Sequence, residues 1–142
     1  MECSRRSRIE GTARLVRLSR DAKTVKVLVS ASAIGIYGPR DDMPLGEDAP
    51  LGNDFLAEVC KAWEAEALEA KSAGIRVVVL RMGHVLAPNG GILGKMVPVF
   101  RLGLGGHFGS GRQYMSWISR EDVLGLVLHA LGRPAVLGGK KG

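Results

Sequence analysis

The sequence has little cysteine and histidine, and both shortages exclude classes of site. Cys3 and Cys60 are its two cysteines, and they form no CxxC pair, so we expect neither a disulfide framework nor a zinc motif. The three histidines, His84, His107 and His129, lie far apart in sequence without thiol or carboxylate partners at ligand spacing. We therefore expect no metal site and a reducing compartment.

Long apolar runs are also missing. No segment approaches the roughly 20 consecutive apolar residues that cross a bilayer. This pattern predicts a soluble protein of the cytoplasm or an organelle matrix, neither secreted nor attached to a membrane.

Aromatic residues are scarce, at 5% of the chain, and this bears on its basic character. Residues 1–26 hold eight basic residues against three acidic ones, which accounts for most of the net charge of +6. No aromatic residue is interleaved with these charges, and no zinc or recognition-helix pattern follows them. We therefore expect no nucleic-acid partner.

The most informative segment that is present spans residues 25–38. A mostly apolar run, Val25 to Val29, leads into Ser30, Ala31 and Ser32 and then a turn that contains Gly35 and Gly38. A run of this kind predicts a strand buried on both faces of a parallel sheet. Open α/β sheets bind their ligands just beyond such strand ends.

Two helices and a second strand are expected around this one. The spacing Ser7-Arg8-Ile9-Glu10 predicts a capping box that opens a helix, and residues 21–24 predict a polar link. After a loop at 39–52, Asn53 or Asp54 predicts the cap of a helix that runs to about Ser72, with its glutamates, including Glu64, on the solvent side. Cys60 is expected in its core face. With a strand at 75–80, this forms a βαβ unit.

The rest of the chain predicts fewer elements. We expect a helix at 92–102 interrupted by Pro98, a third strand at 113–118, and a helix at 123–131 opened by a capping box at Ser119. Two or three strands do not make a full-width sheet. We therefore expect one partial α/β domain over residues 1–142, without a second independent domain.

Two further segments have features of ligand sites. Residues 103–109 have the GxxGxxG spacing of a dinucleotide loop, but no helix pattern follows them, as that loop requires. Residues 112–117 combine Arg112, Gln113, Tyr114 and Trp117, which suit a phosphate and a base or sugar. The alternative is an exposed loop with one buried tryptophan.

Several segments, taken in order, resemble a known family. Residues 7–12, 29–38, 63–64, 80–91 and 109–118 resemble the extended short-chain dehydrogenase/reductases, and more narrowly their atypical branch of nucleoside-diphosphate-sugar epimerase family proteins. The resemblance implies an α/β fold, a partial Rossmann-type parallel sheet with helices on both faces, that binds NAD or NADP. It also implies that residues 83–118 form a substrate-side segment.

The same resemblance implies roles for individual residues. Ser32 matches the hydroxyl that contacts the reacting oxygen in active relatives. Apart from the resemblance, Tyr37 and Tyr114 are phenols that could transfer a proton in place of the tyrosine of active relatives. The implied cofactor-binding residues are Ser30, Ala31, Arg81, Gly83 and Val85. The implied substrate-binding residues are Asn89, Gly91, Lys95, Arg112, Gln113 and Trp117.

The sequence departs from the family in two ways. The glycine-rich phosphate loop of the family lies upstream of everything in this chain, so dinucleotide binding is expected to be weak or absent here, although a full-length parent would bind it. In addition, Leu56 and Cys60 occupy the positions of the Tyr-x-x-x-Lys pair that transfers protons in active relatives.

Two functions follow from these observations. The first is a fragment of an NAD(P)-dependent sugar-nucleotide epimerase or reductase-like protein, an isomerase or oxidoreductase acting on a small molecule such as a nucleotide sugar, and inactive alone. The second is a non-catalytic member that binds a dinucleotide or a partner and has a regulatory role.

Overall fold

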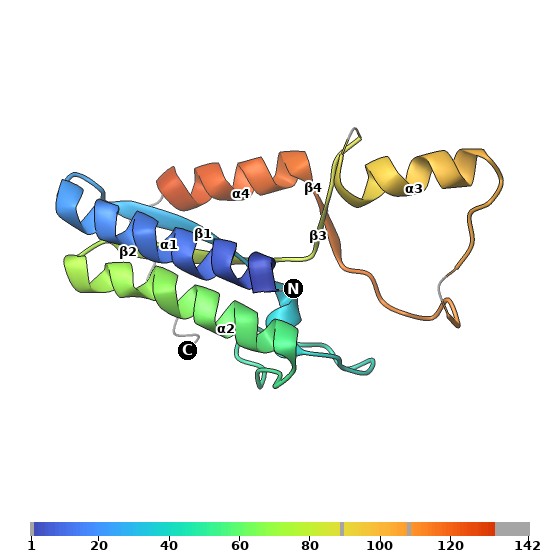
Figure 1. Ribbon diagram of the computed structural model, residues 1–142, viewed down its shortest axis with the longest axis horizontal. Helices are drawn as coiled ribbons and strands as arrows, with labels where there is room; N and C mark the ends of the chain where they lie inside the picture. The colour runs from blue at the N-terminus through green and yellow to red at the C-terminus, as the bar shows by residue number, and fades with distance from the viewer. Residues whose placement is uncertain (1, 89, 108, 133–142) are drawn as a thin grey trace, which may run out of the picture. The chain divides into compact units, whose positions relative to one another are not determined.

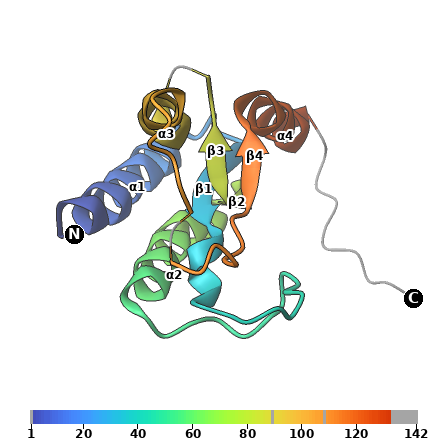
Figure 2. The same cartoon turned by 90° about the vertical axis from the view of Figure 1, so that its right-hand side faces the viewer.

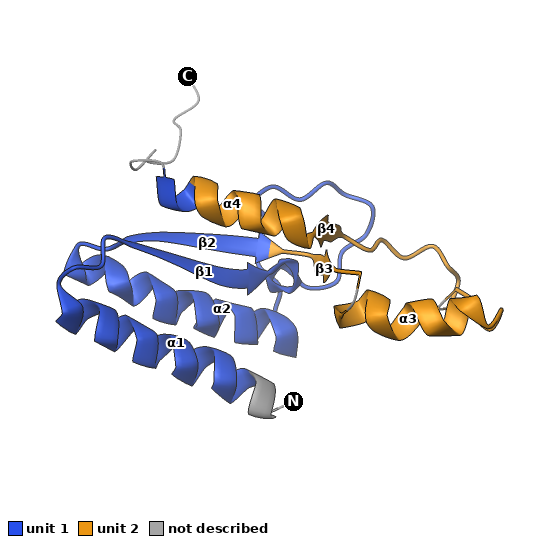
Figure 3. Ribbon diagram, turned by 90° about the horizontal axis from the view of Figure 1, so that it is seen from above, with its two compact units in different colours: residues 1–81, 130–142 blue, residues 82–129 orange. Residues whose placement is uncertain are grey.

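The computed structural model describes residues 2–88, 90–107 and 109–132. The chain forms two compact units, residues 1–81 with 130–142 and residues 82–129 (Figure 3). Within the described ranges, no helix is both long and apolar enough to cross a membrane.

The first unit contains the predicted βαβ arrangement. Its elements, in chain order, are α1 (Glu2–Ala22), β1 (Val27–Ala33), the 3-10 helix η1 (Ile34–Tyr37), α2 (Phe55–Leu68), the 3-10 helix η2 (Glu69–Ala73) and β2 (Arg76–Met82), of which Met82 falls in the second unit. β1 and β2 are hydrogen-bonded neighbours that run in the same direction (Figure 3). α1 and α2 lie side by side along this pair (Figure 1).

The core of this unit lies between the strands and the two helices. Val16, Leu28, Ala70 and Ile75 form one buried cluster. β1 alternates along its length, with Leu28, Ser30 and Ser32 buried and Ala31 exposed. The prediction that this strand is buried on both faces is therefore wrong, because α1 and α2 cover one face and leave the alternate residues in contact with solvent.

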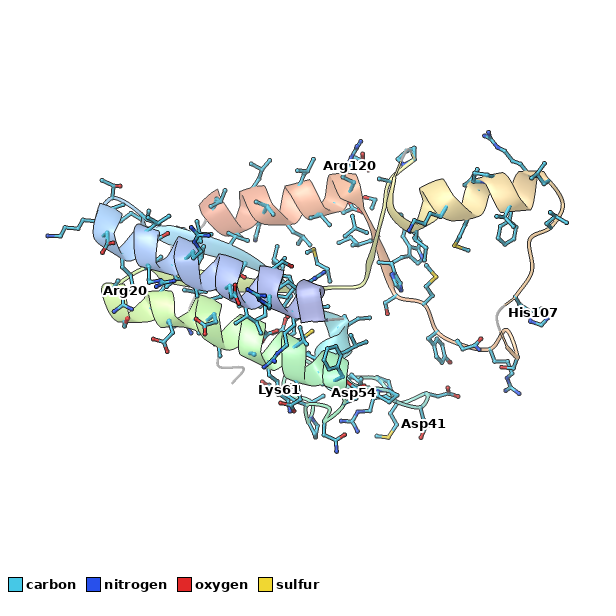
Figure 4. The ribbon with its side chains drawn as sticks, viewed as in Figure 1. Arg20, Asp41, Asp54, Lys61, His107 and Arg120 are labelled. Atoms are coloured by element: carbon cyan, nitrogen blue, oxygen red, sulfur yellow. The ribbon has the colours of Figure 1, made fainter. Side chains whose placement is uncertain are left out.

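The boundaries of the helices agree only in part with the capping signals. α1 begins at Glu2, well before the predicted box at Ser7, and its first turns are supported by an ion pair between Arg6 and Glu10 at 3.0 Å. It also continues to Ala22, so residues 21–22 are helical and not a link. The expected start of α2 is confirmed, since the Asp54 carboxylate, labelled in Figure 4, accepts a 2.7 Å bond from the amide of Ala57.

The second unit is built around a short parallel pair. Its elements are β3 (His84–Leu86), α3 (Gly91–Arg101), β4 (Trp117–Ser119) and α4 (Arg120–Gly132), the last turn of which belongs to the first unit. β3 pairs with β4 in parallel, with His84 opposite Trp117 (Figure 2). The sequence predicted no strand at 84–86, and the strand predicted at 113–118 is limited to residues 117–119.

α3 is not interrupted at Pro98, contrary to the prediction. Proline removes one donor, the one that would bond the carbonyl of Gly94, and Gly94 is exposed so water can satisfy that carbonyl. The cap at Ser119 predicted for α4 is confirmed, although the Asp122 carboxylate bonds the Ser119 hydroxyl rather than its backbone amide, as a capping box requires. The amide of Asp122 donates to Ser119 Oγ at 3.0 Å, and the Ser119 hydroxyl donates to Asp122 Oδ2 at 2.8 Å.

Candidate functional site

The candidate site of the first unit starts at the carboxyl end of β1. Because β1 alternates, Ser30 and Ser32 face the interior, while Ala31 between them is exposed. The Ser30 hydroxyl donates locally to the carbonyl of Ala31 at 3.3 Å. Ser32 is only 4% exposed, and its hydroxyl donates to Glu64 Oε1 at 2.5 Å.

Glu64 belongs to α2 and is buried, at 8% exposure. The prediction that it lies on the solvent side is wrong. Its spacing from Cys60 and Ala67, which are also buried, places it on the same face of the helix. A buried carboxylate requires partners, and β2 supplies one of them.

Arg81 on β2 is that partner. Its Nε donates to Glu64 Oε1 at 2.9 Å and its Nη2 to Glu64 Oε2 at 2.8 Å, which makes a two-point ion pair. Its Nη1 donates to the Tyr37 hydroxyl at 2.9 Å and to the carbonyl of Glu47 at 3.0 Å. The guanidinium also lies 5.4 Å from the centre of the Tyr37 ring. Three predicted site residues, Ser32, Tyr37 and Arg81, thus belong to one network. Its carboxylate, Glu64, was not predicted from the sequence as a site residue.

The charges of this network are fixed at neutral pH. Burial opposes ionisation of Glu64, but the hydrogen bonds from Arg81 and Ser32 outweigh it, so the pKa of this carboxyl lies below its ordinary value of 4.5. The hydrogen bonds to Glu64 raise the pKa of Arg81 further above its usual range. Glu64 is therefore a permanent hydrogen-bond acceptor and a poor proton shuttle.

The segment that follows β1 is held by backbone carbonyls. Arg40 donates to the carbonyl of Tyr37 at 3.1 Å and to that of Pro50 at 2.8 Å. Gly52 approaches Gly38 so closely that a Cβ added to Gly52 would lie 2.6 Å from the backbone nitrogen of Gly38. Loop 39–52, predicted from composition, is therefore anchored at the strand end by both Arg40 and Arg81.

A cavity of roughly 210 Å³ lies near this strand end, with mostly apolar walls. Ala33, Leu56 and Cys60 line it, and two arginines of α1, Arg5 and Arg8, contribute charge. Leu56 is 61% exposed, whereas Cys60 is buried as predicted, and burial raises the pKa of its thiol. Neither side chain can supply the proton transfer of a tyrosine–lysine pair.

The second unit holds the other predicted residues. Gly83 lies against Ser116, where an added Cβ would meet backbone atoms, and Val85 is the middle residue of β3. Gly91, with a φ of 59°, opens α3, and Lys95 is exposed on that helix.

The remaining substrate-side predictions fall at and before β4. Arg112 and Gln113 are exposed, and Trp117 is 64% exposed at the start of the strand. The alternative, an exposed loop with one buried tryptophan, is thus right about the loop at residues 112–116 and wrong about the burial of Trp117. Asn89 lies outside the described residues. Over the described ranges, no three His, Cys, Asp or Glu side chains gather where they could hold a metal ion.

A strand, crossover helix and strand, with polar side chains at the strand end, define a Rossmann-like α/β protein, and the predicted α/β fold class is confirmed. The model of the NAD dependent epimerase/dehydratase family matches residues 4–141, and the chain belongs to this family.

Three comparisons describe its relatives. Epimerase family protein Mb2239 of Mycobacterium bovis is 45% identical over 134 residues, which is 94% of this chain and 44% of that protein. The solved nucleoside-diphosphate sugar epimerase from Corynebacterium glutamicum superposes with a TM-score of 0.82 at 38% identity, covering 91% of this chain and 28% of that one. Human epimerase family protein SDR39U1 (isoform 2), solved with NADPH, gives a TM-score of 0.80 at 34% identity over 93% of this chain and 46% of that chain. The chain thus spans less than half the length of these relatives.

Proposed function

We propose that this chain forms the nicotinamide-side and substrate-side part of an NAD(P)-dependent protein that acts on a nucleotide sugar. The proposal rests mainly on Ser32, a buried hydroxyl at the carboxyl end of β1 whose direction is fixed by Glu64 and Arg81. Strand ends of this kind are where open α/β sheets bind ligands.

Each residue has a role in this proposal. Ser32 and Tyr37 are assigned to the reacting group. Ser30 and Ala31 of the first unit are assigned to the cofactor, as are Gly83 and Val85 of the second unit. Arg81 contributes by holding Glu64 and the loop, since its guanidinium already makes four hydrogen bonds. The substrate-side residues are Asn89, Gly91, Lys95, Arg112, Gln113 and Trp117.

The cavity beside Leu56 and Cys60 fits part of the cofactor. A nicotinamide dinucleotide, when bound, supplies hydride transfer. Sites for whole ligands typically measure about 300–1,000 Å³, whereas this cavity measures about 210 Å³ with apolar walls, enough for one ring. We therefore expect this chain alone to bind the dinucleotide weakly or not at all, and to be inactive.

A non-catalytic role is the second candidate, and Leu56 and Cys60 favour it. An exposed leucine and a buried, protonated thiol stand at the positions of the proton-transfer pair. In this role the same surface binds a dinucleotide or a partner without turnover. A reducing compartment fits both candidates, because Cys60 is a free thiol.

A chimaera tests the proposal. The matched residues of this chain replace their counterparts in the Mycobacterium bovis relative, with which they share 45% identity, and NADPH and NADH are titrated calorimetrically. The isolated chain is measured in parallel, and human SDR39U1 is the positive control.

We expect the chimaera to bind one of the two dinucleotides, the isolated chain to bind them weakly or not at all, and Ser32→Ala to lower turnover of a nucleotide sugar. A chimaera that melts cooperatively but binds neither dinucleotide contradicts the enzyme function. Equal turnover in Ser32→Ala removes Ser32 from the mechanism, whereas dinucleotide binding without any turnover of the nucleotide sugar supports the non-catalytic role.

A further inference from the structure

The Ser32 hydroxyl has one proton, and its direction is set by its partner. The oxygen lies 2.5 Å from Glu64 Oε1, a length typical of a hydroxyl that donates to a carboxylate. A hydroxyl that gives its proton to one acceptor keeps only oxygen lone pairs for a second partner.

Glu64 remains available as that acceptor because Arg81 holds both of its oxygens. The two guanidinium bonds, at 2.9 and 2.8 Å, orient the carboxylate plane. Arg81 is fixed in turn by the Tyr37 hydroxyl and the carbonyl of Glu47. Four residues from β1, η1, α2 and β2 thus determine the direction of one O–H bond.

We propose that Glu64 is a positioning residue, which turns the Ser32 hydroxyl inward so that Ser32 meets a ligand as a hydrogen-bond acceptor. A ligand hydroxyl or amide N–H can then donate to the Ser32 oxygen. A ligand carbonyl cannot, because its oxygen and the Ser32 oxygen would face each other without a proton between them. The inference rests on the proposed function for the place of Ser32 in a binding site. It adds the polarity of the group that the site selects.

The first test uses this chain without any ligand. Carbon-13 labelled glutamate allows the Glu64 carboxyl to be followed by NMR as the pH is lowered, with the exposed Glu69 as an internal reference. Ser32→Ala is expected to raise the midpoint of the Glu64 titration, because it removes one of the donors to the ionised form. Glu66→Gln, on the same helix, is the matched control and should leave that midpoint in place. An unchanged midpoint in Ser32→Ala shows that Ser32 does not donate to Glu64 and overturns the inference.

The second test measures polarity with two probes of equal shape, cyclohexanol and cyclohexanone, on the NADPH-loaded chimaera. We expect the alcohol to bind about fivefold more tightly than the ketone, which corresponds to about 1 kcal/mol. Ser32→Ala should abolish this preference. In Glu64→Gln the side-chain amide can donate to the Ser32 oxygen, which leaves the Ser32 proton free for a ligand. This variant should therefore reduce or reverse the preference for the alcohol, provided that the amide NMR spectrum of the variant shows a folded chain.

The two tests separate this inference from the proposed function. If the chimaera does not bind NADPH, the proposed function is contradicted. The Glu64 titration is measured on the unliganded chain and does not depend on that result. Equal binding of the two probes, whether measurable or absent, contradicts the acceptor role of Ser32 even where NADPH binds.

Discussion

Replacement of Arg81 by methionine tests the network at the end of β1 most directly. The change keeps an apolar stem of similar length but removes four hydrogen bonds, two of them to Glu64. The Glu64 side chain is only 9% exposed, so its carboxylate is left buried with Ser32 as a donor. Breaking a buried ion pair by removing one partner costs about 3–5 kcal/mol, and we expect about 3 kcal/mol because Arg81 itself is 27% exposed. Urea unfolding at pH 7 measures this difference in the free energy of unfolding.

Two comparisons make that prediction specific. Arg6→Met, which breaks an ion pair whose side chains are 69% and 60% exposed, should cost less than about 1 kcal/mol. Adding Glu64→Met to Arg81→Met should recover most of the loss, because two apolar side chains replace the pair.

The pH dependence follows from the Glu64 carboxyl, whose pKa is lowered on folding. Its stabilising effect is therefore fully present above the ordinary value of 4.5 and is lost as the pH falls through the lower folded value. The difference in the free energy of unfolding between the wild-type chain and Arg81→Met should become smaller below that pH. A cost no greater than that of Arg6→Met, or a difference that is the same at low and neutral pH, refutes the reasoning.

Two further predictions concern backbone contacts. Gly83→Ala should cost about 1–3 kcal/mol through overlap with Ser116 and should speed amide exchange along β3, whereas Gly106→Ala, where a Cβ meets open space, should leave exchange unchanged. Asp54→Ala should lower the free energy of unfolding by about 1 kcal/mol through loss of the α2 cap, and Asp41→Ala in the exposed loop by less than about 0.5 kcal/mol. Equal effects within either pair contradict the corresponding contact.

The features predicted well from the sequence are those determined by neighbouring residues. The cap at Asp54 and the cap at Ser119 each depend on atoms within a few residues of one another. Such signals do not state how far a helix extends when its flanking residues are good helix formers, which is why the start of α1 at Glu2 was missed. β3 was missed for another reason, since three residues carry no measurable periodicity.

The central residue of the candidate site was missed because its partners are distant in sequence. Glu64 meets Ser32 from 32 positions away and Arg81 from 17 positions away, so helical periodicity alone assigned it to solvent. One signal was present: an arginine near the end of an apolar strand needs a buried or rim partner. The crossover helix packs against the sheet that contains this strand, so a carboxylate on the helix is the first candidate for this partner.

The same contacts limit what the site can do chemically. The Tyr37 hydroxyl accepts a bond from Arg81 at 2.9 Å and donates to the carbonyl of Glu47 at 3.3 Å, so its proton is already engaged inside the protein. Glu64 stays ionised, and Leu56 and Cys60 offer no transferable proton at neutral pH. The oxygen of Ser32 is therefore the group of this network that remains for a ligand, and it acts by accepting a hydrogen bond. Turnover at this strand end then requires either that Tyr37 leave Glu47 or that the proton come from the ligand or solvent, whereas binding and orientation require no rearrangement.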